Sequence, residues 1–201
     1  MKIIVIGATG TIGTKVVEAL KASHHEVVAA ARSRGIKVNL DVQASIRAMF
    51  DQIRDVDGVV CCAGNAAFRP FSQLTDADYE LGLRSKLMGQ VSLARIAIDH
   101  LRDGGSITLT TGVLAMQPIP GSASLSMVNA GLEGFVRAAA LEMPRNLRIN
   151  AVSPPWVKET LVKLGMDPSP GLAAADVAKA YVAAVEGSHQ GKVLDPRGWA
   201  K

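Results

Sequence analysis

Seven residues near the start of the chain, Gly-Ala-Thr-Gly-Thr-Ile-Gly at 7–13, have the spacing of a phosphate-binding turn. They follow the apolar run KIIVIG at 2–7 and open a segment with helical periodicity. Glycines in such a strand-to-helix turn let the backbone approach a pyrophosphate, which the positive end of the helix stabilises. We predict that this turn binds the phosphates of a dinucleotide. The alternative is that the glycines only allow a tight turn.

The end of the second predicted strand, EVVAAA at 26–31, indicates which dinucleotide. NAD sites usually carry an acidic residue here that binds the ribose hydroxyls. This chain instead has Arg32, Ser33 and Arg34, whose guanidinium and hydroxyl groups suit a 2′-phosphate. We therefore predict NADP(H) as the cofactor. The alternative is that the two arginines are exposed loop charges.

The positive net charge of +4 is confined to the beginning of the chain. Residues 1–40 carry six basic and two acidic side chains, and the remaining 161 residues are balanced. A local excess favours a local anionic ligand over a nucleic-acid surface, although a solvated basic face has the same composition. No apolar run reaches the ~18 residues of a membrane span. We expect neither nucleic acid nor membrane as a partner.

Short apolar runs alternate with longer helical patterns along the 201 residues. Such alternation predicts a parallel sheet covered by helices on both faces. We predict one α/β domain over 1–201, a Rossmann-like doubly wound parallel sheet, with a small substrate-loop region at about 155–175. The predicted strands are 2–7, 26–31, 36–40, 57–64, 105–111, 147–153 and 191–195. The predicted helices are 11–22, 43–53, 75–101, 124–143 and 176–187, and Thr75 with Asp78 resembles a helix cap.

Two adjacent cysteines, Cys61 and Cys62, lie inside a predicted strand. They offer no metal-ligand spacing and no disulfide framework. We expect reduced, buried thiols and no metal site. The amino terminus lacks the apolar region and cleavage site of a signal peptide, so we expect a cytoplasmic protein.

Over nearly its whole length the chain resembles the short-chain dehydrogenases/reductases. The resemblance is carried by the turn at 7–13, Asp41-Val42, Cys62-Ala63-Gly64, Lys86-Leu87-Met88-Gly89, NAGLEGFVRAAALEM at 129–143 and NAVSP at 150–154. The G-x-x-G-x-x-G spacing is similar to that of the family's atypical or extended branches.

The resemblance implies a set of cofactor-binding residues. The phosphate turn would use Gly7, Thr9, Gly10, Thr11, Ile12 and Gly13, and the adenosine half would contact Arg32, Ser33, Asp41 and Val42. The ribose and nicotinamide would contact Ala63, Gly64, Asn129, Pro154 and Val157. Asp41 could also cap the helix that follows it.

The resemblance fails at the residues that do the family's chemistry. In the family a tyrosine donates a proton, and a lysine four residues later lowers its pKa. Here Leu125 and Asn129 stand at these positions. Leucine has no exchangeable proton, and neutral asparagine can only donate or accept hydrogen bonds. The two tyrosines of the chain, Tyr79 and Tyr181, are expected in the core or at its rim.

Three other residues are the catalytic candidates. Thr111, next to the position of the family's serine, could orient a carbonyl oxygen, or it could simply end a strand. Lys86 stands where the family has an asparagine, and a buried lysine can titrate near neutrality. The alternative is an ordinary solvated helix lysine. Asn129 could bind a ribose hydroxyl.

These observations support two hypotheses about function. The first is an NADP(H)-dependent oxidoreductase that transfers hydride to or from a small carbonyl or quinone-like substrate. The second is a catalytically degenerate NADP(H)-binding redox sensor or regulatory module. In either case the resemblance implies a homodimer or higher homo-oligomer through the helices at 75–101 and 124–143, with a monomer as the alternative.

Overall fold

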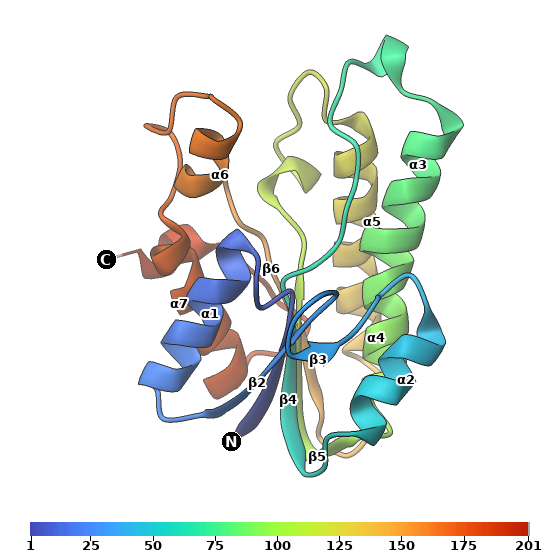
Figure 1. The fold of residues 1–201 in the computed structure, drawn as a ribbon, viewed down its shortest axis with the longest axis vertical. Helices are drawn as coiled ribbons and strands as arrows, with labels where there is room; N and C mark the ends of the chain where they lie inside the picture. Colours follow the sequence, from blue (N-terminus) through green and yellow to red (C-terminus); the bar gives the residue numbers. More distant parts are fainter. Residues whose placement is uncertain (201) are drawn as a thin grey trace.

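The computed structural model describes residues 1–200 and has one parallel sheet of seven strands (Figure 1). The strands lie in the order β3-β2-β1-β4-β5-β6-β7, so the strand order reverses between β1 and β4. This confirms the predicted Rossmann-like, doubly wound α/β fold. The strands are β1 (Lys2–Ile6), β2 (Glu26–Ala31), β3 (Ile36–Lys37), β4 (Val56–Cys61), β5 (Leu101–Thr110), β6 (Arg148–Val152) and β7 (Val193–Leu194).

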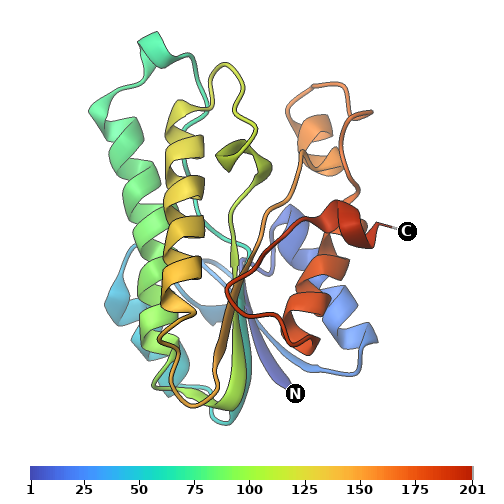
Figure 2. The same ribbon diagram turned by 180° about the vertical axis from the view of Figure 1, so that it is seen from behind.

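Helices cover both faces of the sheet, as Figures 1 and 2 show from opposite sides. The side chains of β1 alternate between the two helix layers. Ile3 and Val5 face one layer, while Ile4 and Ile6 face the other. The first layer is α1 (Thr11–Ala22) and α7 (Ala174–Glu186). The second layer is α2 (Gln43–Asp51), α4 (Gly89–Ala97) and α5 (Ala123–Ala139). Each fully buried Ile or Val contributes about 1.5–3 kcal/mol to this packing.

The predicted long helix begins where expected. Thr75 caps α3 (Asp76–Gly82), because its hydroxyl accepts from the Asp78 N–H and Asp78 accepts from the Thr75 N–H. The helix continues through a π-helical turn at Leu83–Met88 into α4. It ends at Ala97, not at residue 101, because Leu101 already begins β5.

Several predicted boundaries are wrong. The strand predicted at 36–40 covers only Ile36–Lys37, because the Asn39 side chain accepts from the Asp41 N–H and turns the chain. The strand predicted at 57–64 ends at Cys61, and the last strand shrinks to Val193–Leu194. The helix predicted at 124–143 ends at Ala139, before Pro144. Smaller shifts move the ends of the strands near 105 and 147 and of the helices near 53 and 176.

The region 155–175 contains a helix that the sequence did not predict, α6 (Lys158–Lys163). It follows β6 and stands at the carboxyl end of the sheet (Figure 1). Three short 3₁₀ turns complete the described elements, at Phe71–Gln73, Val113–Ala115 and Pro196–Trp199. No helix within residues 1–200 is long and apolar enough to cross a bilayer.

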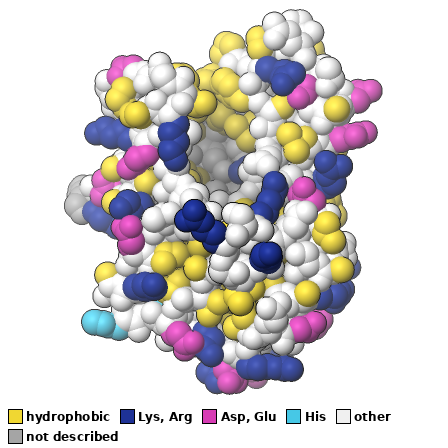
Figure 3. Space-filling model, in the orientation of Figure 1, with side chains coloured by type: hydrophobic (Ala, Val, Ile, Leu, Met, Phe, Trp, Pro, Cys, Tyr) yellow, Lys and Arg dark blue, Asp and Glu magenta, His cyan; other side chains and the backbone are white. Residues whose placement is uncertain are grey.

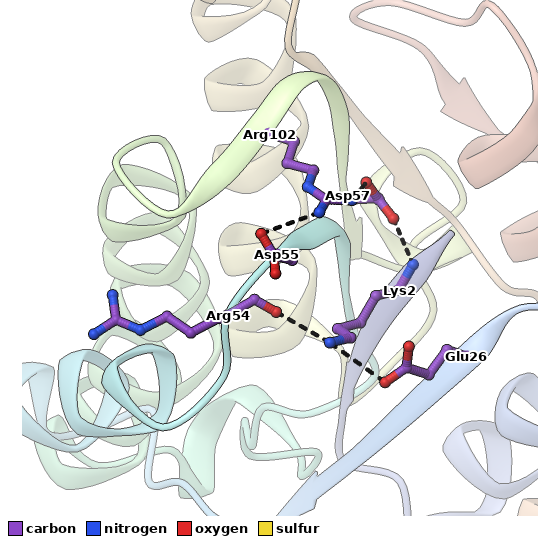
Figure 4. Close-up of polar contacts among 6 residues, drawn as sticks. All are labelled: Lys2, Glu26, Arg54, Asp55, Asp57 and Arg102. Atoms are coloured by element: carbon purple, nitrogen blue, oxygen red, sulfur yellow. Dashed lines mark hydrogen bonds and ion pairs between the residues drawn. The ribbon is translucent and has the colours of Figure 1, made fainter.

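The opposite end of the sheet carries a cluster of ion pairs (Figure 4). The Lys2 backbone N–H donates to Asp57 Oδ2 at 2.6 Å, and an Arg102 guanidinium nitrogen lies 3.0 Å from Asp55 Oδ1. The exposed pairs of this kind contribute at most ~1 kcal/mol each. They join the amino ends of β1, β4 and β5, far along the strands from the carboxyl ends where an open α/β sheet places its ligand site.

Candidate functional site

The carboxyl end of the sheet is hollowed, and the hollow opens between the α6 segment and the α3–α5 helices (Figure 3). Two adjoining cavities share the wall formed by Cys62, Ala63 and Gly64. We name them the glycine-turn cavity, of about 310 Å³, and the Lys86 cavity, of about 300 Å³. The first is lined by Ile6, Gly7, Thr9, Gly10, Ala31, Arg32, Ser33, Val38, Leu40, Asn65, Ser85 and the shared wall.

The glycines of the turn are required by space as well as by conformation. Gly7 has φ of 79°, and a Cβ there would lie 2.9 Å from the Cys62 carbonyl carbon. A Cβ on Gly13 would lie 2.0 Å from the Gly7 carbonyl oxygen. Both distances are shorter than real Cβ contacts, so positions 7 and 13 have room for glycine but not for a residue with a side chain.

The amino end of α1 is open to an anion. Gly10 is its N-cap, no side chain caps the helix, and its first turn holds no acidic residue. The first N–H groups of a helix have no partner within the helix, and they favour a phosphate. Gly7, Thr9 and Gly10 line the glycine-turn cavity, while Ile12 lines the Lys86 cavity. Thr11 and Gly13 of the predicted set line neither.

Only some of the residues predicted to contact the adenosine half line the glycine-turn cavity. Arg32 and Ser33 line the glycine-turn cavity, whereas Arg34 does not. Asp41 and Val42 also lie outside the lining, and Val42 is exposed as the N-cap of α2. The Oδ1 atom of Asp41 is nevertheless buried without a hydrogen-bond partner, directly after Leu40 of the cavity wall.

The Lys86 cavity is lined by most of the residues that we predicted to take part in catalysis or to contact the ribose and nicotinamide. Predicted residues in its wall are Ile12, Ala63, Gly64, Lys86, Thr111, Asn129, Pro154 and Val157. Leu125 lines it too, at the position where the resemblance places a tyrosine. The wall is completed by Cys62, Thr110, Gly112, Val113, Leu114, Pro155, Trp156 and Thr160, so it is mostly apolar.

Lys86 is a buried lysine, with 8% of its surface exposed. It lies in the π-helical turn, and its stem packs so closely on Gly64 that a Cβ there would lie 3.0 Å from Lys86 Cα. Its Nζ donates to the Thr111 carbonyl oxygen at 3.2 Å. Burial lowers the pKa of Lys86 to about 8. Burial also raises the pKa of the Cys61 thiol to about 12, so this thiol is neutral.

Gln90 fixes the helix turn that carries Lys86, a role that the sequence did not indicate. Its side chain is fully buried and exchanges hydrogen bonds with the Thr110 backbone, at 2.9 Å to the carbonyl and 2.8 Å from the N–H. It also donates to the Lys86 carbonyl oxygen at 3.2 Å. A buried glutamine one turn after the lysine was the only signal available in the sequence.

Asn129 is 2% exposed, and its Oδ1 has no hydrogen-bond partner. An unpaired buried amide oxygen costs about 1–3 kcal/mol, so its presence in a cavity wall indicates a donor from a ligand. The amide nitrogen lies against Gly112, 3.0 Å from where a Cβ would stand. A side chain at 112 would therefore press on the Asn129 amide.

The Thr111 hydroxyl has partners within the protein. It lies 3.3 Å from Glu133 Oε1 and 3.4 Å from the Val152 carbonyl oxygen. Glu133 is itself buried and accepts from Arg137 at 3.0 Å. A hydroxyl has one proton to donate, so a substrate oxygen would compete with Glu133 for it. The sequence did not single out Glu133.

No tyrosine or serine takes the place of the missing acid. Tyr181 is fully buried on α7, its hydroxyl lies 2.6 Å from Thr110 Oγ1, and burial raises its pKa. Tyr79 is half-buried on α3. The hydroxyls near Leu125 bond elsewhere: Ser122 donates to Ile119, Ser124 to Asp78 and Ser126 to Ser122.

The arrangement suits a long ligand with anionic groups at one end and a reactive apolar group at the other. Asp41 Oδ1 and Asn129 Oδ1 are two buried acceptors without partners; Asp41 directly follows Leu40 of the glycine-turn cavity, and Asn129 lines the Lys86 cavity. The glycine turn between them leaves space that a Cβ would fill. These features fit a dinucleotide, and Lys86 supplies a cation at the reactive end. Among residues 1–200 no cluster of His, Cys, Asp and Glu could hold a metal ion.

Comparison with protein families gives one matching model over residues 7–187, described as enoyl-(acyl carrier protein) reductase. The hydroxynaphthalene reductase-like protein Arp2 of Metarhizium brunneum is 32% identical over 133 residues, 63% of this chain and 50% of that protein. Versicolorin reductase 1 of Aspergillus parasiticus is 30% identical over 149 residues, 72% of this chain and 55% of that protein. The chain spans about half the length of the curated relatives that it matches.

Solved structures match over nearly the full chain. The protein lin1944 from Listeria innocua is 39% identical, with a TM-score of 0.91, over 97% of this chain and 98% of that one. A small-chain dehydrogenase in complex with NADPH is 26% identical, with a TM-score of 0.87, over 100% and 98%.

Proposed function

The chain belongs to the short-chain dehydrogenase/reductase family, and from that premise we propose that it is an NADP(H)-dependent reductase of a small carbonyl or quinone-like substrate. One observation carries the proposal. Lys86, which is buried, and Asn129, whose buried Oδ1 has no hydrogen-bond partner, line the same cavity. That cavity adjoins the glycine turn, where the family binds its cofactor.

The cofactor, when bound, supplies a hydride. The backbone of Gly7 and Gly10 and the amino end of α1 would hold its phosphates. Arg32 and Ser33 would hold a 2′-phosphate, since both line the glycine-turn cavity and no acidic side chain follows β2. The relative solved with NADPH supports this choice of dinucleotide.

Lys86 handles the charge that hydride addition leaves on the substrate oxygen. A cation in a mostly apolar cavity stabilises such a charge more strongly than it would in water. With a pKa lowered to about 8, the Lys86 ammonium is charged at neutral pH and is a stronger acid than an ordinary lysine. When Nζ gives its proton to the oxygen it becomes neutral, which its burial favours.

Lys86 and Asn129 exchange the positions that the family gives to its asparagine and lysine. The amide on α5 cannot lower a neighbouring pKa, but its unpaired oxygen can accept from a ribose hydroxyl of the cofactor. The ammonium on the helix opposite takes over the charged role. Thr111 contributes a carbonyl oxygen that orients the ammonium at 3.2 Å, and its hydroxyl could turn toward the substrate.

The residues that line the Lys86 cavity indicate the class of substrate. Leu114, Leu125, Trp156 and Val157 give the cavity an apolar lining, which favours a small apolar carbonyl or quinone over a charged molecule. Two relatives are named as reductases, which supports reduction as the direction.

Leu125 favours a second candidate function. Because a leucine faces the cavity in place of the family's acid, a chain that binds NADP(H) without turning it over is the alternative. Such a protein would act as a redox sensor or regulatory module. It would bind NADPH and NADP with different consequences for assembly or for a partner.

The test mixes the protein with NADPH and a panel of aldehydes, ketones and quinones and follows the loss of nicotinamide absorbance. Saturable turnover with at least one acceptor is the expected result, and Lys86→Met should reduce it. Tight binding of NADPH without turnover of any acceptor would favour the sensor. Failure to bind NADPH would contradict both candidates.

A further inference from the structure

Lys163 joins two segments that lie 152 positions apart in the sequence. Its Nζ donates a hydrogen bond to Thr11 Oγ1 at 2.7 Å, from the last residue of α6 to the first residue of α1. Figures 1 and 2 both show α6 standing beside the amino end of α1. The side chain thus crosses the gap between the α6 segment and the phosphate turn.

This contact places two positive charges together. A helix amino terminus carries roughly half a positive charge, and Lys163 adds a full one beside it. No side chain caps α1, its first turn has no acidic residue, and within residues 1–200 no carboxylate pairs with Lys163. Lys163 is exposed, so solvent screens its repulsion from the helix end, but both groups attract an anion that lies beside them. The site therefore favours an anionic ligand.

The position of Thr11 indicates which anion. Thr9 and Gly10 line the glycine-turn cavity, and Ile12 lines the Lys86 cavity. Thr11 itself lines neither cavity, but the turn that carries it passes from one cavity to the other. If each cavity holds one half of a dinucleotide, as the proposed function requires, the group at the junction is the pyrophosphate that links the halves.

The α6 segment is held at its base and exposed beyond it. The Lys158 N–H donates to the Leu172 carbonyl oxygen at 2.9 Å, and the Glu159 carboxylate accepts from the Ala174 N–H at 3.0 Å. Leu161 is buried. Beyond it, Val162, Leu164 and Met166 are exposed, so contacts of Lys163 hold a part of the chain that has little apolar packing of its own.

We propose that Lys163 binds the cofactor's pyrophosphate, with its hydrogen bond passing from Thr11 to a phosphate oxygen, and so holds α6 over the cleft. This inference rests on the proposed function but adds a contact outside the glycine turn. The proposal gives Arg32 and Lys163 different roles in binding the cofactor. Arg32 selects for the 2′-phosphate, whereas Lys163 contacts a group that NADPH and NADH share.

The test compares Lys163→Gln with Lys158→Gln, which removes an exposed lysine from the same helix. Isothermal titration measures the Kd of NADPH, of NADH and of adenosine 2′-phosphate, which keeps the 2′-phosphate and lacks both phosphates of the pyrophosphate. For K163Q we expect about tenfold weaker binding of both dinucleotides, as for the loss of one charge-assisted hydrogen bond, and a smaller change for adenosine 2′-phosphate. K158Q should match the wild type.

Hydrogen exchange of residues 158–169 supplies a second readout. NADPH should protect this segment in the wild type and in K158Q, and protect it less in K163Q at saturating ligand. Unchanged dinucleotide affinity in K163Q, an equal loss for adenosine 2′-phosphate, or an equal loss in K158Q would overturn the role of Lys163 while leaving the proposed function intact. A wild type that binds no dinucleotide would overturn both.

Discussion

The Lys86 ammonium donates to the Thr111 carbonyl oxygen at 3.2 Å, and this bond joins the long helix to the end of β5. An ammonium has three protons to donate. The bond to Thr111 uses one of them, and the residues Lys86 and Asn129 line the same cavity. The lysine is thus oriented by the protein and can still donate to a ligand.

Replacing Lys86 by methionine should abolish most of the turnover while sparing the cofactor. Methionine keeps the apolar stem that packs on Gly64 and removes the charge. Loss of a general acid typically costs roughly 10²–10⁴-fold in rate, so kcat should fall by that factor. The Kd of NADPH, measured by titration, should change less than about threefold. Arg84→Met is the matched control, because Arg84 is an exposed residue of the same π-helical turn. Equal kcat values for K86M and R84M would remove Lys86 from the mechanism.

The same substitution should stabilise the fold at neutral pH. The pKa of Lys86 falls from 10.5 to about 8 on burial, so the folded state disfavours the charge by about 3 kcal/mol when both states are protonated. This penalty is complete below the folded pKa, shrinks as the pH rises from about 8, and vanishes above the unfolded pKa. Urea unfolding should therefore give K86M a gain of about 3 kcal/mol near pH 7 and about 1 kcal/mol near pH 9.5. A gain that does not change with pH would refute the assignment of the buried charge.

Arg32→Ala should weaken NADPH binding and leave NADH binding unchanged. Arg32 lines the glycine-turn cavity at the end of β2, so only a ligand with a 2′-phosphate loses a charge-assisted bond. The Kd of NADPH should rise about 10- to 100-fold by titration. Lys37→Ala, a nearby exposed cation outside the cavity lining, serves as the control. Equal losses for NADPH and NADH would mean that Arg32 does not read the 2′-phosphate.

The two long helices should form a homodimer interface, as we propose from their exposed apolar residues. Leu83, Met88 and Met127 are 40–46% exposed, and Gly131 of α5 packs on Leu87 of the neighbouring helix, which makes the pair of helices one surface. Light scattering should give twice the chain mass of 21.1 kDa for the wild type and for Leu164→Asp, whose site is an exposed residue after α6. Met127→Asp should give the chain mass itself. A wild-type mass of one chain at micromolar concentration would contradict the dimer.

Local patterns in the sequence predicted the fold and the glycine turn well. The turn at 7–13 is defined by neighbours in the chain, and the Thr75–Asp78 cap by a spacing of three, so both can be read directly. The strand at 36–40 failed because the Asn39 side chain competes for backbone hydrogen bonds. Helix α6 was missed because six residues between prolines carry too little periodicity.

The reacting end depends on contacts between distant segments. The burial of Lys86 depends on Gly64, 22 positions away, and on Gln90 bonding to β5. Likewise the Thr111 hydroxyl contacts Glu133, and Lys163 reaches Thr11, only because the fold brings these elements together. The sequence could name Lys86, Thr111 and Asn129 as candidates through the family resemblance. It could not show that Lys86 is buried, that the Thr111 hydroxyl already has a partner within the protein, or that Asn129 Oδ1 has none.

The pH dependence of single-turnover reduction by NADPH, measured in the wild type and in K86M with an acceptor found in the panel, tests the role of Lys86 most directly. If Lys86 supplies the proton, the wild-type rate is constant below a pH of about 8 and falls about tenfold for each further unit, because the acid form is lost. The reverse oxidation should rise with pH through the same region, and K86M should be slow and lack this transition. A wild type and K86M that share one pH profile and one rate would contradict the central role of Lys86.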